Sequence, residues 1–159
     1  MDSKAELYLK RARTELNISV LLVKTSNNSI LKQFDISEDE TFYSGVISHC
    51  YYSIFYLAKA MLLSKGIETK APEVHKKTLD AFKKQFIDTG LLNVKLLLIY
   101  KKMIIKAESL LEIFRIEKKK RGDFTYNTIA QANIEPANES IENAKTFFKH
   151  CNAYLYSKK

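Results

Sequence analysis

The chain has 159 residues, of which 46% are hydrophobic and 28% are charged. This length and balance are typical of one globular domain with its own core, and they exclude an intrinsically disordered chain. The 26 Lys and Arg residues outnumber the 18 Asp and Glu residues, so the net charge is +8 and the pI is near 9.3. A positive surface attracts polyanions, which favours a phosphate-bearing partner.

The N-terminal residues and the apolar runs predict a cytoplasmic protein with no membrane segment. Residues 1–6 are polar and acidic, and no apolar stretch of the signal-peptide kind follows them. Lys or Glu residues interrupt the apolar runs well before the ~20 residues that a membrane span needs. The two cysteines imply no disulfide framework, so we expect a reducing compartment.

Glycine and proline residues divide the chain into five segments with helical periodicity. Five of the six Gly and Pro residues lie between such segments, as expected when Gly follows a helix and Pro opens one. In chain order, the apolar stripes of these segments are Leu7, Ala12, Leu16, Val20 and Val23; Val46, Ile47, Cys50, Ile54, Ala58, Met61 and Leu62; Val74, Thr78, Phe82 and Phe86; Leu96, Ile99, Met103, Leu110 and Phe114; and Ile141, Ala144, Phe148, Cys151 and Leu155. Spacings of three and four residues predict an all-α protein, an antiparallel bundle of about five helices that forms one domain over residues 1–159.

Two longer polar segments connect the predicted helices. We interpret residues 25–40 as an inserted loop, in which Ile30, Leu31 and Phe34 are expected to pack back onto the body of the domain. Residues 122–135 form the second loop, behind a fourth helix over about 93–121. Loops of this length in a compact domain often carry function.

Two matched dipeptides, His49-Cys50 and His150-Cys151, raise the question of a zinc site. Adjacent residues of a helix point about 100° apart, so neither dipeptide presents both of its side chains to one ion. Both cysteines lie on apolar stripes, where cysteine is commonly a small buried hydrophobe. The sequence also contains no Gly-rich phosphate loop and no nucleophile elbow, so we predict no metal site and no cofactor.

The tyrosines of the second helix allow two interpretations, and both stay open. In the first, each ring packs in the core and its hydroxyl reaches the edge. In the second, Tyr52 and Tyr56, together with Ser48, His49 and Lys59, form a semi-polar face that packs against another subunit.

A basic run marks the expected end of the fourth helix: Lys118, Lys119, Lys120 and Arg121. Cations at a helix C-terminus offset the negative end of its dipole, which explains the run without a ligand. Beyond it, however, Asp123, Phe124 and Tyr126 place a carboxylate and two aromatic rings beside the guanidinium of Arg121. Arginine binds phosphates bidentately and aromatic rings stack on bases, so the basic run is a candidate RNA or nucleotide contact.

Residues 48–63, Ser-His-Cys-Tyr-Tyr-Ser-Ile-Phe-Tyr-Leu-Ala-Lys-Ala-Met-Leu-Leu, resemble the second helix of HEPN domains. Residues 89–92, Thr-Gly-Leu-Leu, are similar to the turn after the family's third helix, and residues 121–126 resemble its Arg and acidic–aromatic segment. The resemblance covers essentially the whole chain and implies a small helical bundle that forms homodimers. It also implies RNA cleavage or nucleotide binding, a toxin–antitoxin or defence system, and often a minimal nucleotidyltransferase as partner.

The chain departs from the pattern of HEPN domains in one respect. Many active HEPN members carry an Arg followed four to six residues later by a His, but no His follows Arg115 or Arg121 within that window. Which of these two arginines corresponds to the family's arginine stays open. The candidate catalytic residues are Arg121, Asp123 and Tyr126, with a histidine such as His49 or His75 entering from elsewhere as the acid or base.

The leading hypothesis is a HEPN-like homodimer that binds nucleotide or RNA, or docks a nucleotidyltransferase. We expect the dimer to use the second and fourth helices, with Tyr52 and Tyr56 at the interface, so that two copies of Arg121 face a shared groove. The alternative is a metal-independent endoribonuclease toxin, and whether the chain is an enzyme stays open. A third possibility is a structural dimer whose basic charge serves solubility alone.

Overall fold

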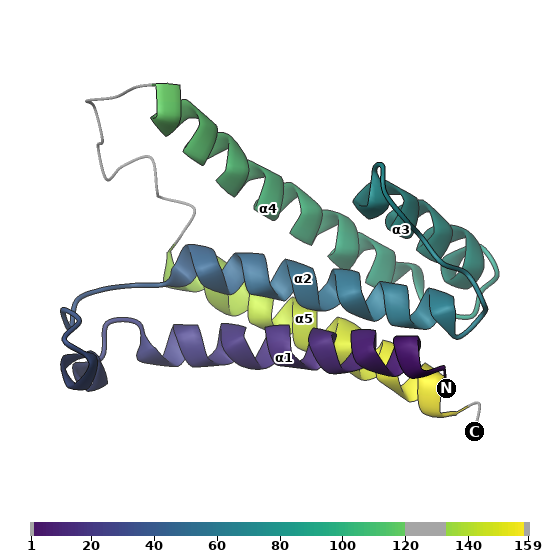
Figure 1. The fold of residues 1–159 in the computed structure, drawn as a ribbon, viewed down its shortest axis with the longest axis horizontal. Helices are drawn as coiled ribbons and strands as arrows, with labels where there is room; N and C mark the ends of the chain where they lie inside the picture. Colours follow the sequence, from purple (N-terminus) through teal and green to yellow (C-terminus); the bar gives the residue numbers. More distant parts are fainter. Residues whose placement is uncertain (1, 120–132, 158–159) are drawn as a thin grey trace.

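A computed structural model describes residues 2–119 and 133–157 of the chain, with side chains over 2–112 and 133–157. Every regular element within those ranges is helical, which confirms the predicted all-α class (Figure 1). In chain order the elements are α1 (Ser3–Thr25), a 3-10 helix η1 (Ser29–Phe34), α2 (Tyr43–Leu63), α3 (Val74–Phe82), a π-helical turn η2 (Lys83–Ile87), α4 (Val94–Lys119) and α5 (Ile134–Tyr156).

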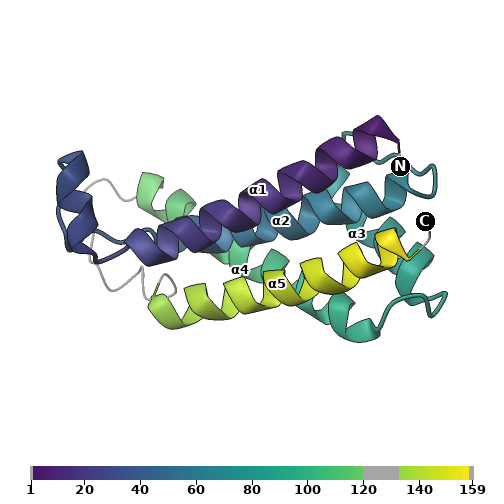
Figure 2. The same cartoon turned by 90° about the horizontal axis from the view of Figure 1, so that it is seen from below.

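Helix α2 lies at the centre of the bundle, with α1 and α5 along its length (Figures 1 and 2). Helix α4 packs on α2 near its own start and then diverges from it towards its C-terminal end, while α3 lies beside the start of α4 (Figure 1). Both chain ends lie at one end of the bundle, and the C-terminal end of α4 lies at the other (Figure 1). Only α2, among the described helices, is long and apolar enough to cross a membrane, but 72% of that stretch is buried, as in the core helix of a soluble protein.

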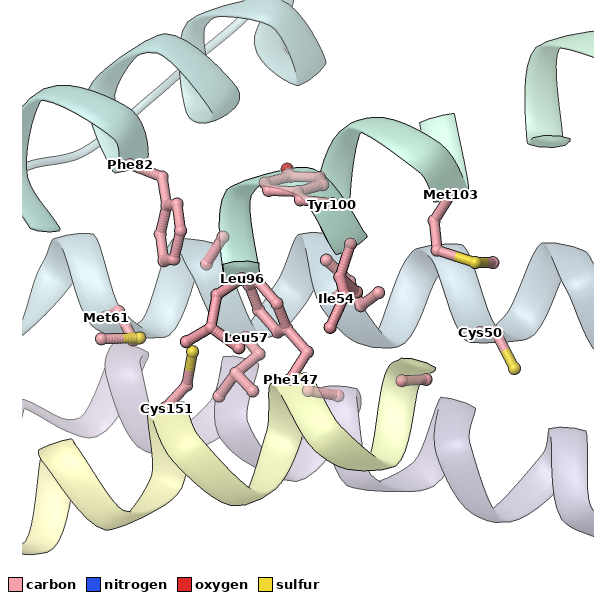
Figure 3. Close-up of a cluster of buried hydrophobic side chains, with 14 of the residues drawn as sticks. Cys50, Ile54, Leu57, Met61, Phe82, Leu96, Tyr100, Met103, Phe147 and Cys151 are labelled. Carbon is pink, nitrogen blue, oxygen red and sulfur yellow. The ribbon is translucent and has the colours of Figure 1, made fainter. Parts of the chain in front are cut away.

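The core is a layer of large aromatic rings between α2, α3, α4 and α5 (Figure 3). The ring of Phe82 lies 5.4 Å from Phe86, 5.4 Å from Phe147 and 6.0 Å from Tyr100, measured between centroids. All four side chains are fully buried. The predicted stripe of α2 is buried throughout, and Thr78, Phe82 and Phe86 of the third predicted stripe are buried too, whereas its Val74 is only partly buried. In α5 the fully buried ring belongs to Phe147, and its neighbour Phe148 is only partly buried.

Small residues make the contact between α1 and α2. Ala5, Ala12 and Ser19 recur every seven residues along α1 and are fully buried. The hydroxyl of Ser53 in α2 donates a hydrogen bond of 2.8 Å to the backbone carbonyl of Ala12, so the two helices approach closely. The predicted stripe is wrong at Leu7, which is 64% exposed, because this close approach requires small side chains.

The segment predicted as a loop between α1 and α2 contains the helix η1. The backbone amide of Asn27 donates a 2.8 Å hydrogen bond to the carbonyl of Glu40, which ties the two ends of the segment together. Leu31 packs into the body as predicted and is buried. The prediction is wrong for Ile30 and Phe34, which are 40% and 63% exposed, since η1 turns only one side towards the domain.

Both cysteines are buried, which confirms their interpretation as small core residues. Desolvation raises the pKa of the Cys50 thiol to about 11 and that of Cys151 well above its usual value. Within residues 2–112 and 133–157, no three His, Cys, Asp or Glu side chains lie close enough together to hold a metal ion.

Candidate functional site

A pocket of about 440 Å³ opens where α4 diverges from α2, with α3 at its side. We call it the aromatic pocket, and its main lining residues are Tyr51, Tyr52, His75, Lys76, Glu108 and Leu111. The dipeptide Tyr51-Tyr52 supplies two rings that point about 100° apart on α2, so both the depth and the rim of the pocket are aromatic. The first turn of α3 contributes His75 and Lys76, and α4 contributes the remaining wall.

His75 is held in place by two aromatic neighbours. Its Nδ1 atom lies 2.6 Å from the hydroxyl of Tyr51, within hydrogen-bond distance. Its ring stacks on Phe55, with the centroids 4.2 Å apart and the planes 27° apart. Desolvation, helped by the positive charge of Lys59, lowers the pKa of His75, so the imidazole is neutral at pH 7. A fixed, neutral imidazole can both donate and accept a hydrogen bond.

Burial raises the pKa of Tyr51 to about 12, and the neighbouring hydroxyl of Tyr52 adds to this shift. The phenol of Tyr51 therefore keeps its proton at neutral pH and orients His75 through a hydrogen bond. The pocket thus combines flat aromatic rings with the imidazole of His75 and the charged groups of Lys76 and Glu108. Pockets of this size and lining are typical small-molecule sites, which span about 300–1,000 Å³.

Tyr52 and Tyr56, the predicted dimer-interface residues, have different environments. Tyr52 is 40% exposed at the rim of the pocket, with its ring centroid 6.1 Å from that of Tyr56. Tyr56 stacks on Tyr8 of α1 at 5.9 Å and is only partly exposed. Lys59 is buried, and its ammonium group donates a 3.1 Å hydrogen bond to the carbonyl of Thr69. Much of the predicted semi-polar face is thus packed within the chain itself, and Tyr52 is its exposed member.

The outer face of α4 carries large apolar side chains that are more than half exposed. They are Val94, Leu98 and Ile105, with exposed fractions of 56%, 61% and 63%, and the helical period places them within about 40° of one another around the axis. Leu111, which is 57% exposed, lies on the side of α4 that lines the aromatic pocket. An apolar helix face of this kind next to a pocket is typical of an interaction surface. We call Val94, Leu98 and Ile105 the α4 apolar face.

A second pocket of about 440 Å³ lies on the other side of α4, beside α5. Its polar groups are paired with each other: Lys102 and Lys106 both bind the carboxylate of Glu139, the second at 3.0 Å. These hydrogen bonds, first from Lys102 and then from Lys106, lower the pKa of Glu139 below its usual value. With these cations occupied, this pocket offers a ligand fewer polar groups than the aromatic pocket does.

The predicted basic run lies at the limit of the described residues. Lys118 and Lys119 form the last turn of α4, where the backbone is described, whereas Lys120 and Arg121 lie outside the described residues. The other candidate catalytic residues, Asp123 and Tyr126, lie outside them too. Their roles, and the choice between Arg115 and Arg121, stay predictions.

Sequence reasoning named His75 only as an acid or base that enters the site from elsewhere. The structure brings it into one pocket with Glu108, from helices more than thirty positions apart in the chain. The Tyr51-Tyr52 dipeptide is the sequence signal that could have indicated this pocket. Adjacent side chains of a helix point about 100° apart, so the two rings cannot both pack against the same neighbouring helix.

Comparisons with known proteins identify a family for this chain. The model of the HEPN domain matches residues 28–154. A protein of Methanocaldococcus jannaschii named as a putative toxin is 37% identical over 75 residues, which are 47% of this chain and 48% of that relative. A Thermotoga maritima protein of the UPF0332 group is 28% identical over 142 residues, or 89% of this chain and 83% of the relative. The match thus spans about half the length of the archaeal relative, and no solved structure matches significantly.

Proposed function

The chain belongs to the HEPN domain family, and on that premise we propose that it is a toxin-related HEPN module that binds RNA or a nucleotide as a homodimer in the cytoplasm. The archaeal relative named as a putative toxin supports the link to toxins. The basic pI supports a polyanionic ligand.

The aromatic pocket is the observation that carries this proposal. Stacking of one base on an aromatic side chain contributes about 1–3 kcal/mol, and every base has a flat face to stack. Tyr52 offers such a face at the rim, and the neutral imidazole of His75 offers hydrogen bonds to a base edge. The helical rise places the backbone of Lys118 roughly 10 Å beyond that of Leu111 at the pocket. The basic run at the end of α4 is therefore the proposed contact for the phosphate of a nucleotide bound there.

The α4 apolar face supports the proposed dimer. Three large apolar side chains on one face of the helix, all more than half exposed, gain free energy when a second copy covers them. Tyr52 on α2, the predicted interface residue, is 40% exposed, so α2 and α4 together are the proposed interface. A minimal nucleotidyltransferase is the proposed protein partner, on the strength of the family resemblance.

Fluorescence anisotropy with labelled single-stranded RNA at low salt tests the proposed binding. Loss of the Tyr52 ring in Tyr52→Leu should weaken binding by about 1–3 kcal/mol, which is roughly 5- to 150-fold in Kd. Lys76→Gln should also weaken binding, while Lys149→Gln, a matched charge loss on α5, should change it much less. A wild-type protein that ignores RNA and nucleotides at low salt would refute the proposal.

Metal-independent RNA cleavage is the second candidate function, and one observation favours it. His75 is a neutral imidazole in a pocket, and such a group can accept a proton at neutral pH. RNA cleavage in EDTA by the wild-type protein, lost in Arg121→Ala and in His75→Gln, would establish this activity. No cleavage by a folded wild-type protein would leave the binding module as the function.

A further inference from the structure

A buried carboxylate lies at the seam between α1 and α2. The side chain of Glu15 is only 3% exposed, and each of its oxygens accepts one hydrogen bond. Arg11 donates from Nε to Oε1 at 2.7 Å, and His49 binds Oε2 through Nδ1 at 2.5 Å. A buried carboxylate is costly unless it is paired, so this group requires both neighbours.

Both partners of Glu15 keep nitrogen atoms that face solvent. The side chain of Arg11 is 58% exposed and that of His49 is 34% exposed. Within the described part of the chain, the terminal amino groups of Arg11 and the Nε2 atom of His49 have no hydrogen-bond partner. Glu15 therefore orients two outward-facing groups through one carboxylate. A guanidinium binds phosphate as a fork, and a ring nitrogen of histidine donates to it when that nitrogen carries a proton.

A row of aromatic rings runs beside these groups. Tyr52 stacks towards Tyr56 at 6.1 Å and Tyr56 stacks on Tyr8 at 5.9 Å, with interplanar angles of 27° and 17°. The guanidinium carbon of Arg11 lies 5.5 Å from the centre of the Tyr56 ring, so the cation and the rings share one surface. At its other end the row meets His75, whose ring centroid lies 6.3 Å from that of Tyr52.

We infer that the seam of Arg11, His49 and the exposed ring of Tyr52 is a second subsite, which holds the sugar–phosphate backbone of a single-stranded nucleic acid next to the aromatic pocket. This inference rests on the proposed function and names both the path of the strand and its class. Flat rings bind bases only when these are unstacked, so the subsite selects single strands over duplexes. Glu15 acts as a positioning residue, because it holds the two phosphate-binding groups and does not itself touch the strand.

Two neighbouring arginines of α1 provide a matched pair of variants. Arg11→Gln removes the guanidinium at the seam, whereas Arg13→Gln removes the same charge from a side chain that lies 5.5 Å over the ring of Phe148 in α5. For a labelled 12-nucleotide oligouridylate, Arg11→Gln should raise Kd about tenfold. It should also make the decline of the log association constant with log salt concentration less steep, by about one unit of slope. Arg13→Gln should change Kd less than about threefold.

Further ligands and one further variant complete the test. The oligonucleotide should bind more tightly than uridine monophosphate or inorganic phosphate, and more tightly than a 12-base-pair duplex. His49→Gln keeps an amide donor for Glu15 but loses the second ring nitrogen, and it should also weaken binding. Thermal melts establish that each variant is folded.

The outcomes separate this inference from the proposed function. If the wild type binds single strands and Lys76→Gln weakens binding, but Arg11→Gln equals Arg13→Gln, the proposed function stands and the subsite is refuted. Preference for the duplex, or equal binding of inorganic phosphate, also refutes it. If Glu15→Gln lowers only the melting temperature and leaves Kd unchanged, Glu15 merely links the two helices and the positioning role is refuted.

Discussion

The α4 apolar face gives the sharpest prediction, because a matched control exists for it. Leu98 on α4 and Leu21 on α1 have the same exposed fraction of 61%. Replacing either leucine by serine removes the same apolar area from solvent contact. Only Leu98 lies on the proposed dimer interface.

The size of the effect follows from the exposed area. Burying a whole leucine side chain contributes about 1.5–3 kcal/mol, so burying the 61% that Leu98 exposes contributes about 1–2 kcal/mol. A twofold interface buries each residue twice, which doubles the loss to about 2–4 kcal/mol per dimer. Leu98→Ser should therefore raise the dimer dissociation constant roughly 30- to 1,000-fold.

Sedimentation velocity over a wide concentration range measures this constant, and circular dichroism establishes that both variants are folded. Leu21→Ser should leave the dimer unchanged. Two results would refute the reasoning: a wild-type protein that stays monomeric at tens of micromolar, or equal dissociation constants for Leu98→Ser and Leu21→Ser.

Three further predictions concern the core and the titrating groups. Phe147→Ala should lower the free energy of unfolding by about 3–5 kcal/mol in urea denaturation, and a loss below 1 kcal/mol would contradict the core described above. Folding lowers the pKa of His75 below the value of 6.5 that the residue has in the unfolded chain. The stability that His75 contributes is therefore complete above pH 6.5, and it is lost as the pH falls below that value. The melting temperature should thus fall less between pH 7 and pH 5 in His75→Gln than in the wild type, and an identical fall would contradict this. Cys50 and Cys151 should not react with a thiol reagent at pH 8 until the protein is unfolded, and rapid native reaction would show that they are accessible.

The helical fold could be predicted because apolar periodicity and the placement of Gly and Pro agree along the chain. The register of α1 could not, since hydropathy ranks Leu7 above Ala5 and Ser19 although the close approach to α2 requires the smaller side chains. In α5 the adjacent Phe147 and Phe148 both continue a three-to-four spacing, so periodicity alone does not choose between them.

The candidate site was less accessible to sequence reasoning. The pairing of Tyr51 with His75 joins residues 24 positions apart, and that of Glu15 with His49 joins residues 34 positions apart. Such pairs depend on how the helices pack, which no local pattern encodes. Glu15 did carry a signal, because this glutamate continues the three-residue spacing of Leu9 and Ala12 on α1. The roles proposed for Arg121, Asp123 and Tyr126 stay predictions.

The common location of the two chain ends has a practical consequence for attachment. Both ends lie at the end of the bundle away from the C-terminal end of α4 (Figure 1). An affinity tag, a fluorescent label or a fused domain at either terminus therefore starts on the side away from the basic end of α4. Immobilising the protein by either terminus should leave that basic end open to solution, so surface-based and free-solution affinities can be compared directly.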